Sequence, residues 1–206
     1  MSNYVISISR EFGSGGRMIG KQLAARLGIP CYDRTLIQKT AEKSGLSPEF
    51  IARAEERARS RIHLPLASLG TGVAAYTQQG VPVSLQAFFA QSEVIRELAD
   101  EGPCVIVGRC ADYILRERED CLHTFIHASV PFRADRIVRL YGESEKAPEK
   151  RLADKDTRRR VNYKHYTDRE WGMAQNYHIT LDSGVLGIDR CVEIILDLAQ
   201  RDYPEK

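Results

Sequence analysis

The first thirty residues contain a strand, a glycine-rich loop and a helix in direct succession. Residues 5–9 form a short β-branched run typical of a buried strand, and residues 13–16 read Gly-Ser-Gly-Gly. Ile19, Leu23 and Leu27 then recur every four residues, which predicts an amphipathic helix. Glycines let successive backbone N–H groups point inward, and the N-terminus of a helix adds partial positive charge. This order of elements predicts a phosphate-binding loop in an α/β domain.

The loop departs from the usual phosphate-loop signature, G-x-x-x-x-G-K-[ST]. With Gly15 as its last glycine, Gly16 stands in the lysine place and Arg17 in the hydroxyl place, while Arg10 stands in the place of the first glycine. We therefore expect an ATP site here to take its cation from Arg17, without a loop hydroxyl for Mg²⁺ at the usual position. The alternative is a tight strand-to-helix turn that binds nothing.

Composition favours one compact domain. At 206 residues and 43% hydrophobic, the chain can bury one sizeable core, and a single domain with an insertion is expected. The balance of 30 Lys and Arg against 28 Asp and Glu gives no reason to expect nucleic acid or a membrane as partner. No apolar run approaches the roughly 18 residues that span a bilayer, and no signal-peptide pattern precedes the first strand. Five cysteines without C-x-x-C spacing favour reduced thiols in a cytoplasmic protein.

Strands and helices alternate along the rest of the chain. Apolar runs predict four further strands, at residues 29–32, 104–108, 122–129 and 178–182. Their continuous apolar character is typical of a parallel sheet buried on both faces, so the expected fold is a three-layer α/β domain. Arg17, Asp33 and Arg109 follow three different strands, at the carboxyl ends where ligands bind in such sheets. Their convergence favours a phosphate site over a ligand-free turn.

Three other features need an interpretation. His123 and His127 lie four residues apart on a predicted strand, roughly 13 Å from each other, so we expect packing or surface histidines and name no metal ligand. The irregular stretch 61–82 has the length of a functional lid or a mobile segment. Segment 149–169 is basic with interleaved tyrosines, which allows a solvated helix, a nucleic-acid patch, or arginines that close over bound phosphates.

Three blocks of the sequence resemble one family. ISISREFGSGGRMIGKQLAARLGIPCYDRTLI, VIVGRCADYIL and DKDTRRRVNYKHYTDREWGMAQNY are similar to the cytidylate kinase-like family of bacteria, a divergent branch of the P-loop nucleoside monophosphate kinases. The resemblance implies a single P-loop NTPase domain with a five-stranded parallel sheet. Its core would be residues 1–40, 84–145 and 176–206, with a nucleoside monophosphate-binding insertion at about 41–83 and a helical lid at about 146–175.

The resemblance also implies an activity and its ligands. The reaction would be ATP-dependent phosphorylation of a nucleoside monophosphate, CMP or dCMP first, with Mg²⁺ bridging the ATP phosphates. Partners would be small nucleotides rather than nucleic acid or membrane, and a homodimer is left open. Carried over by position, the catalytic residues would be Arg17, Asp156 and Arg159. The residues around ATP would be Gly13, Ser14, Gly15, Gly16, Arg17 and Arg158. Those around the acceptor would be Asp33, Lys39, Arg109 and Asp112.

Several positions depart from the family pattern. Cys110 replaces the aspartate of the G-R-D motif, which helps to recognise cytosine, and Asp112 is the candidate to take over. Val107 replaces an acid, Leu152 replaces a lid arginine, and Lys39 stands where an arginine usually grips the acceptor phosphate. Two alternatives therefore stay beside the kinase: a nucleotide-binding pseudokinase or regulatory protein without turnover, and a nucleic-acid-binding module that uses the basic segment.

Overall fold

A computed structural model describes residues 4–33, 35–51 and 83–200 of the chain. Its centre is a parallel sheet of five strands in the order β2-β3-β1-β4-β5. The strands are β1 (Val5–Arg10), β2 (Cys31–Tyr32), β3 (Cys104–Val107), β4 (Cys121–His127) and β5 (Ile179–Asp182). This arrangement confirms the expected three-layer α/β fold.

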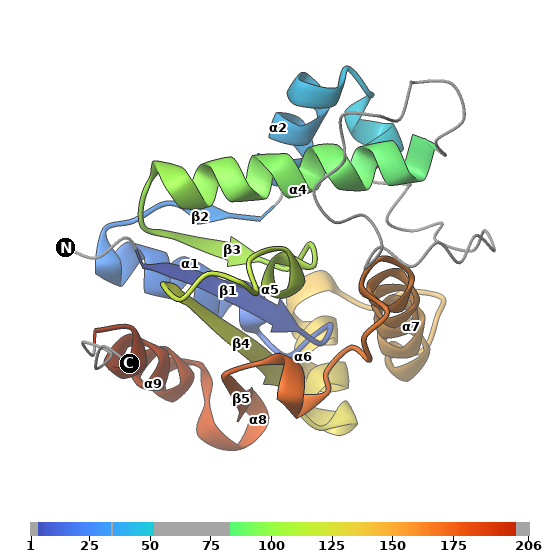
Figure 1. Cartoon of the computed structure of the whole chain (residues 1–206). Coiled ribbons are helices and arrows are strands. Elements are labelled where there is room, and N and C mark those ends of the chain that lie inside the picture. Colours follow the sequence, from blue (N-terminus) through green and yellow to red (C-terminus); the bar gives the residue numbers. More distant parts are fainter. Residues whose placement is uncertain (1–3, 34, 52–82, 201–206) are drawn as a thin grey trace.

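Helices cover both faces of the sheet (Figure 1). They are α1 (Gly16–Leu27), α2 (Thr35–Ser44), α4 (Val83–Glu101), α5 (Ala111–Ile114), α6 (Val130–Tyr141), α7 (Pro148–Thr167), α8 (Ser183–Leu186) and α9 (Ile188–Gln200), with a 3₁₀ turn at Ala174–Asn176. None of the helices in the described residues is both long and apolar enough to cross a membrane. Most of the insertion expected at about 41–83, including the irregular stretch 61–82, lies outside the described residues.

The alternation of side chains along the central strands builds two cores. Ile6 and Ile8 of β1 pack with α1 and α9 on one face, together with Val105 of β3. Val5 and Ile106 point to the other face and pack with α4 and α5. Since successive side chains of a strand point to opposite faces, a run that is apolar throughout has to be covered on both sides. The central strands are therefore held from both faces, which fixes where their carboxyl ends lie.

Three helices, α1, α6 and α7, lie near the carboxyl ends of the central strands. β1 pairs with β3 at Ile8 and Val107 and with β4 at Arg10 and Ile126. The arrowheads of β1 and β3 point toward α6 and α7 in Figure 1. Helix α6 starts directly after β4, where the hydroxyl of Ser129 accepts a hydrogen bond from the backbone N–H of Phe132 at 3.4 Å. The glycine loop at the start of α1 lies at this same edge.

Some predicted boundaries were wrong because local caps differ from those expected. The fourth strand ends at His127 rather than Ser129, since Ser129 caps α6. Helix α4 begins at Val83 and α9 at Ile188. The short helix α8 was not predicted, and the Asp182 carboxylate caps it by accepting from the backbone N–H of Gly184 and Val185.

The two histidines of β4 have structural positions, as predicted. His123 is 4% exposed, with its Nδ1 2.8 Å from the Ser7 hydroxyl, and its ring lies against that of His178. Burial, with the neighbouring His178, lowers the pKa of His123 to about 4. The side chain of His127 is 40% exposed. No group of three or more His, Cys, Asp or Glu able to hold a metal ion occurs in the described parts of the chain.

The lowered pKa of His123 predicts acid sensitivity. The unfolded chain takes up a proton near pH 6.5 and the folded chain only near pH 4, so stability is lost as pH falls through this window. The loss attributable to His123 is on the order of 3 kcal/mol. In urea titrations at pH 7 and pH 4.5, His123→Gln should narrow the stability difference between the two pH values. The exposed control, His127→Gln, should keep the wild-type difference, and equal differences in all three proteins would contradict the assignment.

Candidate active site

A cleft of about 720 Å³ opens at the carboxyl ends of β1 and β3. The glycine loop, the segment after each of the first three strands, α6 and α7 all contribute to its wall. Of the residues predicted from the sequence, those that line it are Gly13, Gly15, Gly16, Arg17, Asp33, Arg109, Arg158 and Arg159. One cavity thus brings together residues that are up to about 150 positions apart in the chain.

The glycine loop has the backbone geometry of an anion site. Gly13 and Gly15 adopt φ of +83° and +86°, left-handed conformations that favour glycine. Helix α1 begins at Gly16, so its first N–H groups lie next to the loop and the helix dipole is positive there. The Ser14 side chain is fully buried, and its hydroxyl donates to the carbonyl of Glu11 at 2.9 Å. Ser14 therefore shapes the loop, while the backbone faces the cleft.

Four guanidinium groups gather around one carboxylate beside the loop. Arg17 Nε lies 2.5 Å from Asp33 Oδ2, and Arg10 Nη2 lies 3.9 Å from Asp33 Oδ1. Burial lowers the pKa of Arg109 to about 10 and that of Arg159 to about 9, and the nearby charge of Arg10 adds to both effects. The positive charges of these arginines repel one another. A bound anion would relieve this repulsion, so the pocket is suited to phosphate.

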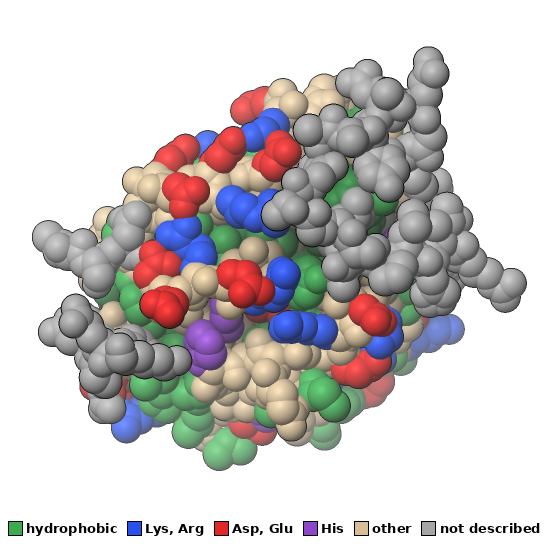
Figure 2. All heavy atoms as spheres, viewed as in Figure 1, with side chains coloured by type: hydrophobic (Ala, Val, Ile, Leu, Met, Phe, Trp, Pro, Cys, Tyr) green, Lys and Arg blue, Asp and Glu red, His purple; other side chains and the backbone are tan. Residues whose placement is uncertain are grey.

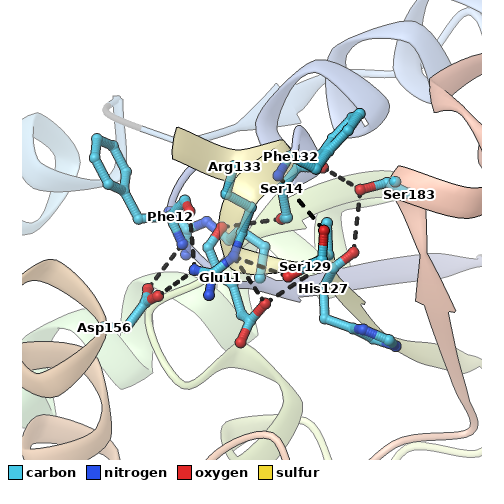
Figure 3. Close-up of polar contacts among 12 residues, drawn as sticks. Glu11, Phe12, Ser14, His127, Ser129, Phe132, Arg133, Asp156 and Ser183 are labelled. Carbon is cyan, nitrogen blue, oxygen red and sulfur yellow. Dashed lines mark hydrogen bonds and ion pairs between the residues drawn. The ribbon is translucent and has the colours of Figure 1, made fainter. Parts of the chain in front are cut away.

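A buried ion pair ties α7 to the glycine loop (Figure 3). Asp156 Oδ1 accepts from the backbone N–H of Phe12 at 2.7 Å, and Asp156 Oδ2 lies 2.5 Å from Arg133 Nη1. Arg133 also donates to the carbonyls of Ala128 and Phe12, at 2.9 and 3.2 Å, and its Nε lies 3.3 Å from Glu11. We call these contacts the loop latch. They join the loop, the start of α6 and the middle of α7.

Asp156 and Arg159 have different positions in this arrangement. The side chain of Asp156 is 9% exposed and belongs to the loop latch, and it does not line the cleft. Arg159, one helical turn later, does line the cleft. It donates to the carbonyl of Arg10 at 3.0 Å and lies 3.3 Å from Asp156. Asp156 is therefore placed to position the loop and Arg159, and only Arg159 is placed to contact a ligand.

Two residues expected at the acceptor are not brought to the cleft. Asp112 is 2% exposed, and its two oxygens accept hydrogen bonds from Ser9 at 3.0 Å and from the Tyr163 hydroxyl at 2.6 Å. Burial raises the pKa of Asp112. Lys39 lies on the exposed face of α2 and does not line the cleft. Asp112 anchors α7 to the sheet, so its carboxylate is not free to recognise a base.

Arg136 is a cation at the loop that the sequence analysis missed. It lines the cleft, and its Nη2 lies 3.5 Å from the position that a Cβ atom on Gly15 would occupy. The same nitrogen is 3.7 Å from the Met18 sulfur. Arg17 also lines the cleft but is paired with Asp33, so Arg136 is a second cation beside the loop. A signal was present: Arg133 and Arg136 are three residues apart on a helix that starts at the sheet's carboxyl edge.

The side chains around the loop do not form a built Mg²⁺ site. Arg17 occupies the place of the usual hydroxyl ligand. The acids that line the cleft are Glu11, which accepts from the backbone N–H of Ala128 at 3.2 Å and lies beside Arg133, and Asp33, which pairs with Arg17. Mg²⁺ often keeps its waters and is held mainly by substrate phosphates. These residues do not fit a metal site of the usual kind, so any Mg²⁺ would enter with the nucleotide.

The comparison with protein families agrees with this geometry. The model of the cytidylate kinase-like family matches residues 5–185. The chain belongs to this family. It is also similar to a cytidylate kinase from Aeropyrum pernix, with 24% identity over 196 residues that cover 94% of this chain and 98% of that protein. The match spans the glycine loop, α7 and the arginine pocket, which is the group formed by Arg10, Arg17, Arg109 and Arg159.

Solved structures with the same fold include kinases. An uncharacterised protein from Eubacterium ventriosum superposes with a TM-score of 0.69 and 23% identity, over 97% of this chain and 99% of that one. Shikimate kinase from Acinetobacter baumannii, in complex with shikimate, gives a TM-score of 0.51 and 15% identity, with 97% of each chain covered. At these identities the likeness shows the fold alone, which is that of the P-loop NTPases.

Because of the loop latch, we expect an isosteric substitution of Asp156 to lower the free energy of unfolding strongly. In Asp156→Asn the amide loses the charge that compensates buried Arg133, and breaking such a pair typically costs about 3–5 kcal/mol. Urea unfolding followed by circular dichroism should show a loss in this range. Asp154→Asn is the matched control on the same helix, where Asp154 pairs with exposed Lys146, and little change is expected. Equal stability of the two variants would show that the latch does not hold α7.

Proposed function

We propose that this protein transfers the γ-phosphoryl group of ATP to a nucleoside monophosphate, with CMP or dCMP as the first candidates. The single observation that carries the proposal is that one cleft joins an anion-binding glycine loop to an arginine pocket around Asp33. A phosphoryl transferase needs two phosphate sites within reach of each other, one for the donor and one for the acceptor. Membership of the cytidylate kinase-like family supports the same reaction.

In the proposed step, a deprotonated oxygen of the acceptor phosphate attacks the γ-phosphorus of ATP. A new P–O bond forms as the bond from the γ-phosphorus to the β–γ bridging oxygen breaks, and ADP leaves with that electron pair. The loop N–H groups and Arg136 would hold the donor phosphates. Arg109 and Arg17 would hold the acceptor, and Arg159 on α7, which also lines the cleft, would reach both. The protein contributes position and positive charge, which are the main needs of phosphoryl transfer.

Helix α7 would act as the lid, and α7 with the residues after it falls within the segment expected at about 146–175. Arg158 and Arg159 approach the cleft from this helix, and Trp171 lines the cleft as well. Covering the cleft would exclude water, which otherwise competes with the acceptor for the γ-phosphate. Acidic and basic side chains are interspersed on the face seen in Figure 2, so this face does not present the continuous positive patch that nucleic-acid binding uses.

The acceptor is tested by a coupled ADP-release assay with Mg-ATP and a panel of nucleoside monophosphates. CMP or dCMP should give turnover above the slow release of ADP without acceptor. Turnover with another nucleoside monophosphate would keep the reaction and replace the substrate, which is plausible because Cys110 stands in the place of the base-recognising aspartate. ATP binding without turnover on any acceptor would favour the pseudokinase alternative.

The variant Arg109→Ala tests whether Arg109 belongs to the acceptor site or to the donor site. Loss of a charged hydrogen-bonding partner typically costs about 1.5–3 kcal/mol, so the KM for the acceptor should rise about tenfold or more while the KM for ATP changes little. Arg116→Ala is the control, because Arg116 follows the same strand but stacks on Tyr113 outside the cleft. A rise in the KM for ATP alone would reverse the assignment of the two sites.

A further inference from the structure

Position 16 cannot hold the usual loop lysine in this fold. A Cβ atom built on Gly16 would lie 2.5 Å from the Cβ and 3.0 Å from the Cγ of Arg10. Real Cβ contacts are not that short, so a side chain at position 16 is excluded by the side chain at position 10. In the usual signature the relation is reversed, with glycine at the first place and lysine at the later one. The two departures from the signature, Arg10 in the place of glycine and Gly16 in the place of lysine, are therefore coupled.

A second glycine makes room for the end of the same side chain. A Cβ atom on Gly108, directly after β3, would lie 1.7 Å from Nη1 and 2.7 Å from Cζ of Arg10. Gly108 also has φ of +78°, which disfavours other residues. The Arg10 side chain thus leaves the end of β1, passes Gly16 and crosses Gly108. Two glycines from different elements accommodate it.

The Arg10 side chain passes the loop at Gly16, and its guanidinium ends in the cleft beside Gly108 and Asp33. Its side chain is 20% exposed and lines the cleft together with Gly13, Gly15 and Gly16. Burial lowers the pKa of Arg10, and Asp33 opposes this effect. The nearest acid, Asp33, is 3.9 Å away and is already paired with Arg17 at 2.5 Å. Arg10 is therefore a confined cation whose side chain starts at the end of β1 and lines the same cleft as the glycine loop.

We propose that Arg10 is a phosphate-binding cation of this site, in addition to Arg136, and supplies from the strand what the loop lysine supplies in other P-loop proteins. The inference rests on the proposed function for the identity of its ligand, a nucleoside triphosphate. Arginine suits the task because its planar fork contacts two phosphate oxygens at once, and its length covers the distance from β1 to the cleft. Arg17, one residue beyond the lysine place, then remains on the Asp33 side.

The test restores the usual arrangement by exchanging the two positions. Four variants are compared: Arg10→Gly, Gly16→Lys, Arg10→Gly/Gly16→Lys, and Arg10→Ala/Gly16→Lys. The last is the matched control, because an alanine Cβ at position 10 would still lie 2.5 Å from the new Cβ at position 16. Thermal unfolding reports folding, and calorimetric titration with Mg-ATP and Mg-ADP reports phosphate binding. The carbonyl of residue 10, which accepts from Arg159, is present in every variant.

Arg10→Gly should stay folded and bind ATP about tenfold or more weakly, with a smaller loss for ADP because the γ-phosphate is the group that loses most. A merely structural role would lower both affinities equally. Gly16→Lys should lower the melting temperature. Arg10→Gly/Gly16→Lys should regain the wild-type melting temperature and most of the ATP affinity, whereas Arg10→Ala/Gly16→Lys should regain neither.

Wild-type ATP affinity in Arg10→Gly would overturn the proposal, as would equal behaviour of the two double variants. The binding readout also separates this inference from the proposed function. A wild-type protein that binds ATP but phosphorylates no acceptor would refute the kinase reaction and leave the role of Arg10 to be decided by the titrations. A wild-type protein that does not bind ATP would refute both.

Discussion

The buried pair between Asp156 and Arg133 is the interaction on which the site depends. A buried ion pair stabilises a fold only when further hydrogen bonds satisfy its remaining atoms. Here the carboxylate also accepts from Phe12, and the guanidinium also reaches two backbone carbonyls and Glu11 (Figure 3). The pair thus fixes the glycine loop relative to α7. Together with the bond from Tyr163 to Asp112, it sets the position of Arg159 at the cleft.

The arginine pocket, formed by Arg10, Arg17, Arg109 and Arg159, has the opposite character, since positive groups outnumber negative ones in it. Its four guanidinium groups face two carboxylates, Asp33 and Asp156, and Asp156 is also engaged by Arg133. Burying like charges costs stability, and burial lowers the pKa of three of these four groups. A ligand with several negative charges would offset this cost in stability. The loop latch therefore stabilises the fold, whereas the excess positive charge of the arginine pocket costs stability and favours an anionic ligand.

The sequence predicted the parts of this structure that depend on local pattern. The five strands, the glycine loop and the helix after it follow from periodicity and from turn residues, and they are present. Contacts between distant segments were not predictable in the same way. Asp112 and Asp156 were assigned to ligands by their place in motifs, but partners more than 20 positions away turn both into anchors of α7. The exposed position of Lys39 on α2 is likewise set by how that helix packs on α4.

Arg10 shows why a departure from a motif has to be interpreted in three dimensions. In the sequence it is only a missing glycine, and Gly16 is only a missing lysine. In the fold a Cβ at position 16 would lie 2.5 Å from the Cβ of Arg10, so a side chain at position 10 requires glycine at position 16, and the end of Arg10 passes over Gly108. A signature of this kind describes where positive charge lies relative to a turn of backbone amides, and different positions along the chain can supply that charge. The loss of a motif lysine is therefore weak support for a pseudokinase when a neighbouring strand delivers a guanidinium to the same cleft.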